Sequence, residues 1–318
     1  MIHLEDKFTF KVAPNDLLTI GEFLVDMISN EYGEESQGDG YTRFPGGSPS
    51  NIAINASKLG IRSQMVSAVG KDGLGTYLTK HLEAAGMNTD GIQRVDAATS
   101  LVVLTKSQAT PIPIIYRDAD FRLTYDAKLE QFLQQSKVVH FSCWPISREP
   151  SRRVIERVME EAKKMGLLIG FDPNYHRMIW EPDEDGVEYV KSIIPKVDIV
   201  KPSEDDAERL FGKANPFKQI DRFLYLGAGL VIMTLGEQGA IVSNGNETIS
   251  FPTMATEVVD TTGAGDAFWS GFYAALLQDY TVREALKLGF AVSAYKLKRL
   301  GAVVDLPKLE SIKAQFGL

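Results

Sequence analysis

The stretch Val259-Asp260-Thr261-Thr262-Gly263-Ala264-Gly265-Asp266-Ala267-Phe268 ends a predicted loop and opens a predicted helix. Its glycines allow a sharp turn and a close backbone approach, so the N–H groups of Gly263, Ala264, Gly265 and Asp266 can point together at one anion. Asp266 also places a carboxylate in the first helical turn, where it is suited to accept the proton of an attacking hydroxyl. The alternative is an acidic residue that only favours the helix dipole.

A second informative stretch is Gly46-Gly47-Ser48-Pro49-Ser50-Asn51-Ile52-Ala53-Ile54-Asn55-Ala56-Ser57-Lys58-Leu59-Gly60. Its two leading glycines permit close backbone approach to a ligand, and a helix is predicted from Asn51 to Leu59. Asn51 offers both a donor and an acceptor to a ligand. Ser50 and Asn51 could instead cap that helix, and the two roles are compatible.

These two segments, in this order, resemble the two signatures of the ribokinase-like family of carbohydrate kinases, often called the PfkB family. The resemblance extends over nearly the whole chain. It includes Gly21-Glu22 with Asp26, His140-Phe141-Ser142, Glu149-Pro150-Ser151, Asp172-Pro173-Asn174, Lys201-Pro202-Ser203-Glu204 and Thr234-Leu235-Gly236-Glu237-Gln238-Gly239.

The resemblance implies transfer of the γ-phosphoryl group of ATP to a primary hydroxyl of a sugar. Asp266 would accept the proton, and the amides from Gly263 to Asp266 would hold the developing charge. We expect the helix dipole to keep Asp266 ionised and therefore a weak base. The residues expected at the sugar are Asp26, Gly46, Gly47, Asn51, Arg117 and Asn174.

The family pattern also implies a nucleotide site with Mg²⁺. The residues expected at ATP are Lys201, Ser203, Thr234, Gly236 and Gly239. Asp206 is the expected residue around Mg²⁺, through water, with a structural helix-start carboxylate as the alternative. Asp260 and the loop near Gly301 resemble the monovalent-cation site of the family, which would hold K⁺, but Phe290-Ala291-Val292-Ser293 departs from the common pattern there.

The sugar itself is indicated by Tyr116-Arg117, a pair that resembles the fructokinase and 2-keto-3-deoxygluconate kinase branches. The guanidinium could fork to sugar oxygens or to a carboxylate, or remain a solvated strand end. His176 stands where those branches carry Arg, which weakens the prediction of an acidic substrate. Fructose is therefore the expected acceptor, followed by 2-keto-3-deoxygluconate and then ribose or a nucleoside. A sugar-binding protein without activity would have no use for Asp266 beside a phosphate cradle.

The order of apolar runs predicts an α/β fold with a mostly parallel sheet and helices on both faces. Strands are expected at 17–20, 64–69, 138–141, 167–171, 197–200 and 230–234, because these runs scarcely alternate and so read as buried on both sides. The resemblance implies a single ribokinase-like unit over 1–318, with a core of 1–26, 45–99 and 118–318. Segments 27–44 and 100–117 would form a small β-sheet lid that pairs with the lid of a second subunit.

Composition favours a cytoplasmic enzyme. A chain of 318 residues with 44% hydrophobic content can bury a large core. The net charge of −8 argues against nucleic-acid binding, and the single Cys143 cannot form an internal disulfide. No segment has the length of a membrane span or the pattern of a leader peptide. The sequence also has no phosphate loop of the form GxxxxGK[ST]. It has no GxGxxG between a predicted strand and a predicted helix, so a dehydrogenase is not indicated.

Overall fold

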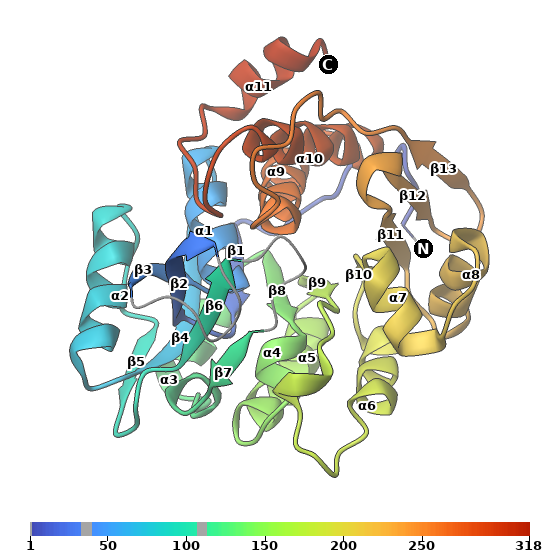
Figure 1. The fold of residues 1–318 in the computed structure, drawn as a ribbon. Coiled ribbons are helices and arrows are strands. Elements are labelled where there is room, and N and C mark those ends of the chain that lie inside the picture. The colour runs from blue at the N-terminus through green and yellow to red at the C-terminus, as the bar shows by residue number, and fades with distance from the viewer. Residues whose placement is uncertain (1, 33–39, 107–112) are drawn as a thin grey trace.

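The computed structural model describes residues 2–32, 40–106 and 113–318. Residues 33–39 and 107–112 lie outside it; they belong to the two segments predicted to form the lid. The described chain forms one large sheet flanked by helices and one small sheet at its side (Figure 1).

The large sheet is mostly parallel, as predicted. Within the described residues it has nine strands in the order β13-β12-β11-β10-β9-β8-β1-β4-β5, and only β12 and β13 are attached by antiparallel pairing. Every residue of β1, β8 and β9 is buried, because helices cover both faces of the sheet. The strands are β1 (Leu17–Ile20), β4 (Ser63–Gly70), β5 (Ile92–Val95), β8 (Val138–Ser142), β9 (Leu168–Asp172), β10 (Ile199–Val200), β11 (Leu230–Thr234), β12 (Ala240–Ser243) and β13 (Thr248–Phe251).

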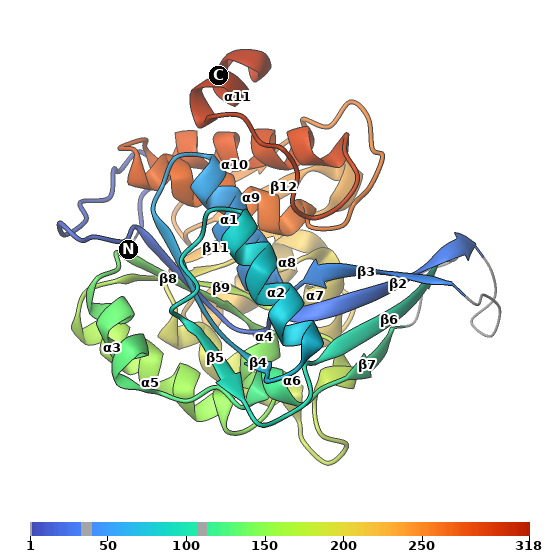
Figure 2. The ribbon, with the colours of Figure 1, turned by 90° about the vertical axis from the view of Figure 1, so that its left-hand side faces the viewer.

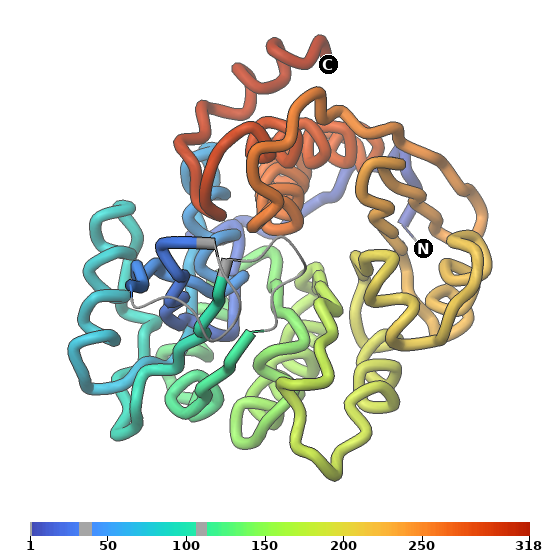
Figure 3. Tube along the Cα trace, viewed as in Figure 1, coloured from blue at the N-terminus to red at the C-terminus, as the bar shows by residue number. Residues whose placement is uncertain are grey.

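Helices form a layer on each face of this sheet (Figures 1 and 3). One core lies between the strands and the helices α3 (Ala127–Gln134), α4 (Cys143–Ile146), α5 (Ser151–Lys164), α6 (Gly186–Ile193), α7 (Glu204–Phe211) and α8 (Pro216–Tyr225). The opposite core contains α1 (Ser48–Lys58), α9 (Ala264–Leu277), α10 (Val282–Leu297) and α11 (Leu309–Phe316), and α2 (Gly73–Ala84) packs beside α1. A capping box of Thr281 and Glu284 begins α10.

The small sheet projects from the body of the molecule (Figure 2). It contains β2 (Leu24–Tyr32), β3 (Tyr41–Gly46), β6 (Leu101–Lys106) and β7 (Ile114–Tyr116) in the order β3-β2-β6-β7. The β2 and β6 strands pair in parallel and the outer pairs are antiparallel. In this register Asp26 lies between Phe44 and Val102, so these three residues share one face of the sheet.

Helix α9 is held against the large sheet by polar contacts as well as apolar ones. Trp269 Nε1 donates to Asp172 Oδ2 at 2.9 Å, and Tyr273 Oη lies 2.9 Å from His140 Nδ1. A side chain at Gly170 would overlap the Tyr273 hydroxyl, so glycine is required at that point of β9. These contacts fix the N-terminus of α9 over the carboxyl ends of the parallel strands, where open α/β sheets bind ligands.

Candidate active site

The loop before α9 holds the glycine turn for which an anion cradle was predicted. Gly263 has φ +71°, and a Cβ there would lie 2.6 Å from the Ala302 side chain, so only glycine fits. The amide of Ala264 donates to the Thr261 carbonyl at 3.1 Å and is therefore used by the turn. Within the described residues, the amides of Gly263, Gly265 and Asp266 have no protein acceptor. These three N–H groups at a helix N-terminus are suited to bind an anion.

Two side chains of α1 donate hydrogen bonds to the Asp266 carboxylate. Ser48 Oγ donates to Asp266 Oδ1 at 2.6 Å, and Asn51 Nδ2 donates to Oδ2 at 2.9 Å. Burial raises the pKa of Asp266, while the bonds from Ser48 and Asn51 lower it and the charge of Asp172 raises it further. The net direction is upward, so the expectation that the helix dipole keeps Asp266 a weak base is wrong. A carboxylate with a raised pKa is a better proton acceptor.

The start of α1 shows whether Ser50 and Asn51 cap the helix, the alternative to a role for Asn51 in ligand binding. The helix begins at Gly47 as N-cap, and no side chain caps it. Ser50 Oγ donates instead to the Gly47 carbonyl at 2.9 Å. The capping role of Ser50 and Asn51 is therefore wrong, and Asn51 turns toward Asp266.

A buried ion pair lies next to the cradle. Lys201 Nζ is 2.8 Å from Asp172 Oδ2, and the two side chains are only 6% and 10% exposed. A Cβ at Gly265 would lie 3.3 Å from Lys201 Nζ, so the ammonium sits directly against the glycine turn. An anion bound by the cradle amides would thus also face the positive charge of Lys201.

Asp26 lies on β2 at the root of the small sheet, beside Gly46 of β3. Burial raises the pKa of Asp26 to about 6. A side chain at Gly46 would overlap the Asp26 carboxylate, and one at Gly47, where φ is +109°, would overlap the Glu22 carbonyl. Among the described residues, no side chain or amide donates to the Asp26 carboxylate, and burial alone shifts its pKa. A desolvated carboxylate without donors is well suited to accept bonds from two neighbouring sugar hydroxyls.

Glu22 is a buried acid to which the sequence pattern assigned no role. Its side chain accepts the Ser48 amide through Oε1 at 3.1 Å, and its Oε2 has no partner among the described residues. Burial is the main cause that raises the pKa of Glu22 to about 8, and the charges of Asp266 and Asp120 add to it. Glu22 is therefore mostly neutral at pH 7 and supports the N-terminus of α1 without adding a full negative charge beside Asp266.

The expected sugar contact of Arg117 does not fit the structure. Its guanidinium, 3% exposed, makes five hydrogen bonds: two to Asp120 Oδ2 and one each to Ser147 Oγ, Ile179 O and Trp144 O. These bonds use all the N–H donors that a guanidinium has. Arg117 consequently holds the end of β7 to α4 and has no donor left for a substrate.

Asn174 follows β9 as an exposed residue with φ +36°. The described contacts do not bring it to Asp266 or Asp26, and its role in sugar binding stays a prediction. His176 lies just beyond, partly buried, where its side chain accepts the Met178 amide at 3.4 Å.

The predicted ATP residues come from neighbouring strand ends. Ser203 and Thr234 form a parallel bridge, and the Thr234 amide donates to Pro202 at 3.0 Å. Gly236 and Gly239 have φ of +56° and +88° in the turn that follows β11. Together with Lys201, these residues lie along the carboxyl edge of the sheet on the side of β10 and β11.

The two predicted metal residues are both engaged by the protein. Asp206 accepts the Ser203 amide and hydroxyl at 2.9 and 2.6 Å in a capping box, and the Tyr175 amide at 2.6 Å, so it has the structural role left open for it. Asp260 accepts the amides of Thr262 and Gly301 at 2.9 and 2.7 Å. In the described part of the chain, no three His, Cys, Asp or Glu side chains converge on one point as a metal site would require.

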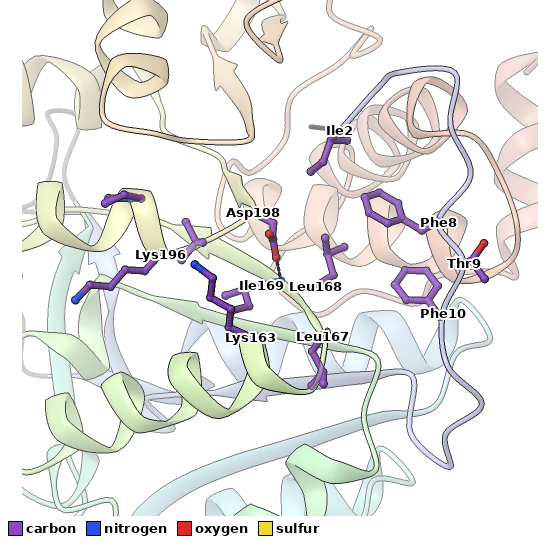
Figure 4. A pocket seen from close by; sticks show the side chains of 13 residues that line it. Ile2, Phe8, Thr9, Phe10, Lys163, Leu167, Leu168, Ile169, Lys196 and Asp198 are labelled. Carbon is purple, nitrogen blue, oxygen red and sulfur yellow. Dashed lines mark hydrogen bonds between the residues drawn. The ribbon is translucent and has the colours of Figure 1, made fainter.

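A separate cavity of about 330 Å³ lies at the amino-terminal ends of the parallel strands, where β9 and β10 begin (Figure 4). Phe8 and Phe10 stack on its wall with centroids 5.7 Å apart, and Asp198 accepts the Ile169 amide at 2.7 Å. The cavity is far along the strands from the cradle and takes no part in the candidate site.

Comparison with known proteins agrees with this geometry. Residues 14–309 match the model of the pfkB family carbohydrate kinases. The chain belongs to this family. It is therefore a sugar kinase, and the resemblance found in its motifs is confirmed.

Three kinases are similar to this chain over most of its length. The ATP-dependent 6-phosphofructokinase of Thermoanaerobacterium thermosaccharolyticum is 56% identical over 100% of this chain and 99% of its own. The fructokinase structure from Halothermothrix orenii is 42% identical with a TM-score of 0.79, covering 86% of this chain and 97% of that one. A sugar kinase of Pyrococcus horikoshii, solved in complex with ATP, has a TM-score of 0.83 at 28% identity and covers 94% and 97%.

No role was predicted for Ser48 and Glu22, although both stand in the motifs quoted for the family. Asp172 stands in the motif Asp172-Pro173-Asn174, but its ion pair with Lys201 could not be predicted because the two residues are far apart in sequence. Lys296, which is buried 3.6 Å from Asp260 Oδ2, stands in none of the quoted motifs.

Proposed function

We propose that this kinase transfers the γ-phosphoryl group of ATP to a primary hydroxyl of fructose. The sugar oxygen forms a bond to the γ-phosphorus while the bond to the bridging β,γ-oxygen breaks, and ADP leaves. The hydroxyl proton passes to Asp266. The observation that carries the proposal is the placement of Asp266, whose amide is one of the free N–H groups of the cradle and whose carboxylate is held by Ser48 and Asn51.

The residues present fit the phosphates of ATP. The free amides of Gly263, Gly265 and Asp266 offer donors, the helix N-terminus favours negative charge, and Lys201 brings an ammonium to Gly265. Mg²⁺ supplies charge neutralisation on the phosphates when bound. It commonly keeps several waters and is held through the nucleotide with few protein ligands.

Fructose is supported by the face of the small sheet that carries Asp26. The side chains next to Asp26 on that face are Phe44 and Val102, which pair with it directly, and Ile115 lies beyond Val102. Among these apolar neighbours the Asp26 carboxylate can hold a neutral sugar by its hydroxyls. The second candidate acceptor is fructose 6-phosphate, which the 56% identical 6-phosphofructokinase favours.

An ADP-release assay with fructose, fructose 6-phosphate, 2-keto-3-deoxygluconate, ribose and adenosine tests the acceptor. We expect the highest kcat/KM with fructose, and ³¹P NMR should show a sugar monophosphate as product. A kcat/KM for fructose 6-phosphate more than tenfold above that for fructose would replace the first candidate by the second.

The assembly and location are also proposals. Ile114 and Tyr116 of β7 are 53% and 59% exposed on the small sheet, an apolar surface that a second copy of the lid would cover. A homodimer through the lid should appear in light scattering and revert to a monomer in a Tyr116→Glu variant. No helix in the described ranges is both long and apolar enough to cross a bilayer. We propose a cytoplasmic enzyme because ATP is its phosphoryl donor.

A further inference from the structure

The last turn of α10 carries a lysine with no exposed surface. Lys296 Nζ donates to the Asp260 carbonyl oxygen at 2.6 Å and lies 3.6 Å from Asp260 Oδ2. Burial lowers the pKa of Lys296, while the charges of Asp260 and Asp266 raise it. A fully buried ammonium is costly unless it is paired and hydrogen-bonded, so these contacts to Asp260 are what make its position tenable.

Asp260 connects this ammonium to the anion cradle. Its carboxylate accepts the Thr262 amide directly before Gly263 and the Gly301 amide from the loop after α10. The amides of Val259 and Asp260 donate to the Leu297 carbonyl at 2.7 and 3.3 Å. The segment that leads into Gly263 is thus fixed to the end of α10 by backbone bonds and by one buried charge.

A monovalent cation at Asp260, the position expected from the family pattern, does not fit this arrangement. A cation there would need oxygen ligands such as the Asp260 carbonyl and carboxylate. Both groups already face the Lys296 ammonium. A cation bound to these Asp260 oxygens would lie close to the Lys296 ammonium, and two positive charges close together in a buried environment repel each other strongly.

We infer that the Lys296 ammonium acts as a built-in cation that holds the Asp260 to Gly263 loop in its anion-binding shape, so that this kinase does not need K⁺. Lys296 is a positioning residue: it acts on the phosphate through Asp260 and the cradle amides. The inference rests on the proposed phosphoryl transfer only in taking that anion to be a nucleotide phosphate.

Cation dependence of the wild-type protein is the first test. ADP affinity by calorimetry, and kcat/KM for ATP, are measured in tetramethylammonium chloride and in KCl at equal ionic strength. Each of these two quantities should differ by less than about twofold between the two salts, since the Lys296 ammonium already supplies the positive charge at Asp260. A rise of more than fivefold with K⁺ in either quantity overturns the inference. The calorimetric arm needs no sugar turnover, so a wrong choice of substrate cannot be mistaken for a wrong role of Lys296.

Removal of the charge is the second test. Lys296→Met keeps most of the volume and should weaken ADP binding roughly 10- to 100-fold, the loss typical of a charge-assisted hydrogen bond. Lys296→Ala opens space, and K⁺ or ethylammonium should restore ADP binding to that variant. The matched control is Lys287→Met, an exposed lysine on the same helix, which should bind ADP like the wild type.

Two results from the variants would overturn the inference: unchanged ADP affinity in Lys296→Met, or a Lys296→Ala variant that no added cation restores although its thermal unfolding is still cooperative. If both variants fail to fold, the cation titration of the wild-type protein decides alone.

Discussion

Ser48 Oγ and Asp266 Oδ1 lie 2.6 Å apart, although the two residues are 218 positions apart in sequence. This bond joins the N-terminus of α1 to the N-terminus of α9, the two helices that carry the glycine-rich stretches. With Asn51 on the other carboxylate oxygen, it fixes the direction in which Asp266 presents its lone pairs. Ser48 and Asn51 of α1 therefore fix the orientation of Asp266, the proposed base.

Ser48→Ala should lower kcat without a comparable change in KM for ATP. The hydroxyl bond stabilises the ionised form of Asp266, so its loss should raise the pKa of Asp266 and shift the acidic limb of the kcat profile to higher pH. We expect roughly a tenfold fall in kcat at neutral pH. A pH profile that keeps its acidic limb in place would show that Ser48 does not act on the base.

Glu22→Gln should change the pH dependence of stability. The folded pKa of about 8 lies above the ordinary value of 4.5, so the wild-type side chain stabilises the fold fully below about pH 4.5 and loses this contribution as pH rises toward 8. The neutral amide does not titrate. The variant should therefore gain stability relative to the wild type between about pH 5 and 8, by up to several kcal/mol at about 1.4 kcal/mol per pKa unit.

Urea unfolding at several pH values measures this difference. Glu83→Gln, on the exposed side of α2, is the matched control and should show no such trend. A constant stability difference across this pH range would mean that Glu22 is ionised throughout.

Arg117→Met should destabilise the protein and leave the ranking of sugars unchanged. The substitution leaves Asp120 as an uncompensated buried charge, which typically costs about 3–5 kcal/mol. Arg122→Met removes an exposed ion pair to Asp118 and should cost about 1 kcal/mol or less. A stable Arg117→Met protein with altered sugar preference would restore Arg117 as a substrate contact.

Asp26 should produce an acidic limb near pH 6 in kcat/KM for the sugar. Its pKa is raised to about 6 by burial, and only the ionised carboxylate can accept two hydroxyl bonds. Asp26→Asn should remove that limb and lower kcat/KM roughly 10- to 100-fold. A limb that persists in the variant would have to come from Asp266 instead.

The buried strands in the parallel part of the large sheet could be predicted from sequence, whereas β12, which is also buried at every residue, was not predicted. Continuous apolar runs marked β1 and β11 with their observed bounds. The edge strands β5 and β13 escaped notice because they are short and partly exposed, so their apolar pattern is weak. A separate small sheet was expected from the two segments 27–44 and 100–117, and the structure confirms it.

The glycine turn at Gly263 and the helix start that contains Asp266 could be predicted, because turn geometry and helix starts leave local marks in sequence, while the catalytic role of these residues stays a prediction. The sugar contact predicted for Arg117 does not fit the structure. The sequence around a strand-end arginine does not show whether its side chain faces solvent, a substrate or a buried carboxylate such as Asp120. Lys296 was invisible for the converse reason: a lysine in an amphipathic helix normally lies on the solvated side. Only the packing of α10 against the Asp260 loop shows that this one does not.

Asp266→Asn is the most direct test of the central claim that Asp266 accepts the hydroxyl proton. The amide is nearly isosteric and can keep one bond from α1, so the affinities for ADP and for fructose by calorimetry should stay within a few-fold of wild type. Release of ADP in the presence of fructose should fall by about 10² to 10⁴ in kcat, the worth of a positioned general base. A variant that binds both ligands and turns over within a few-fold of the wild-type rate would contradict the account.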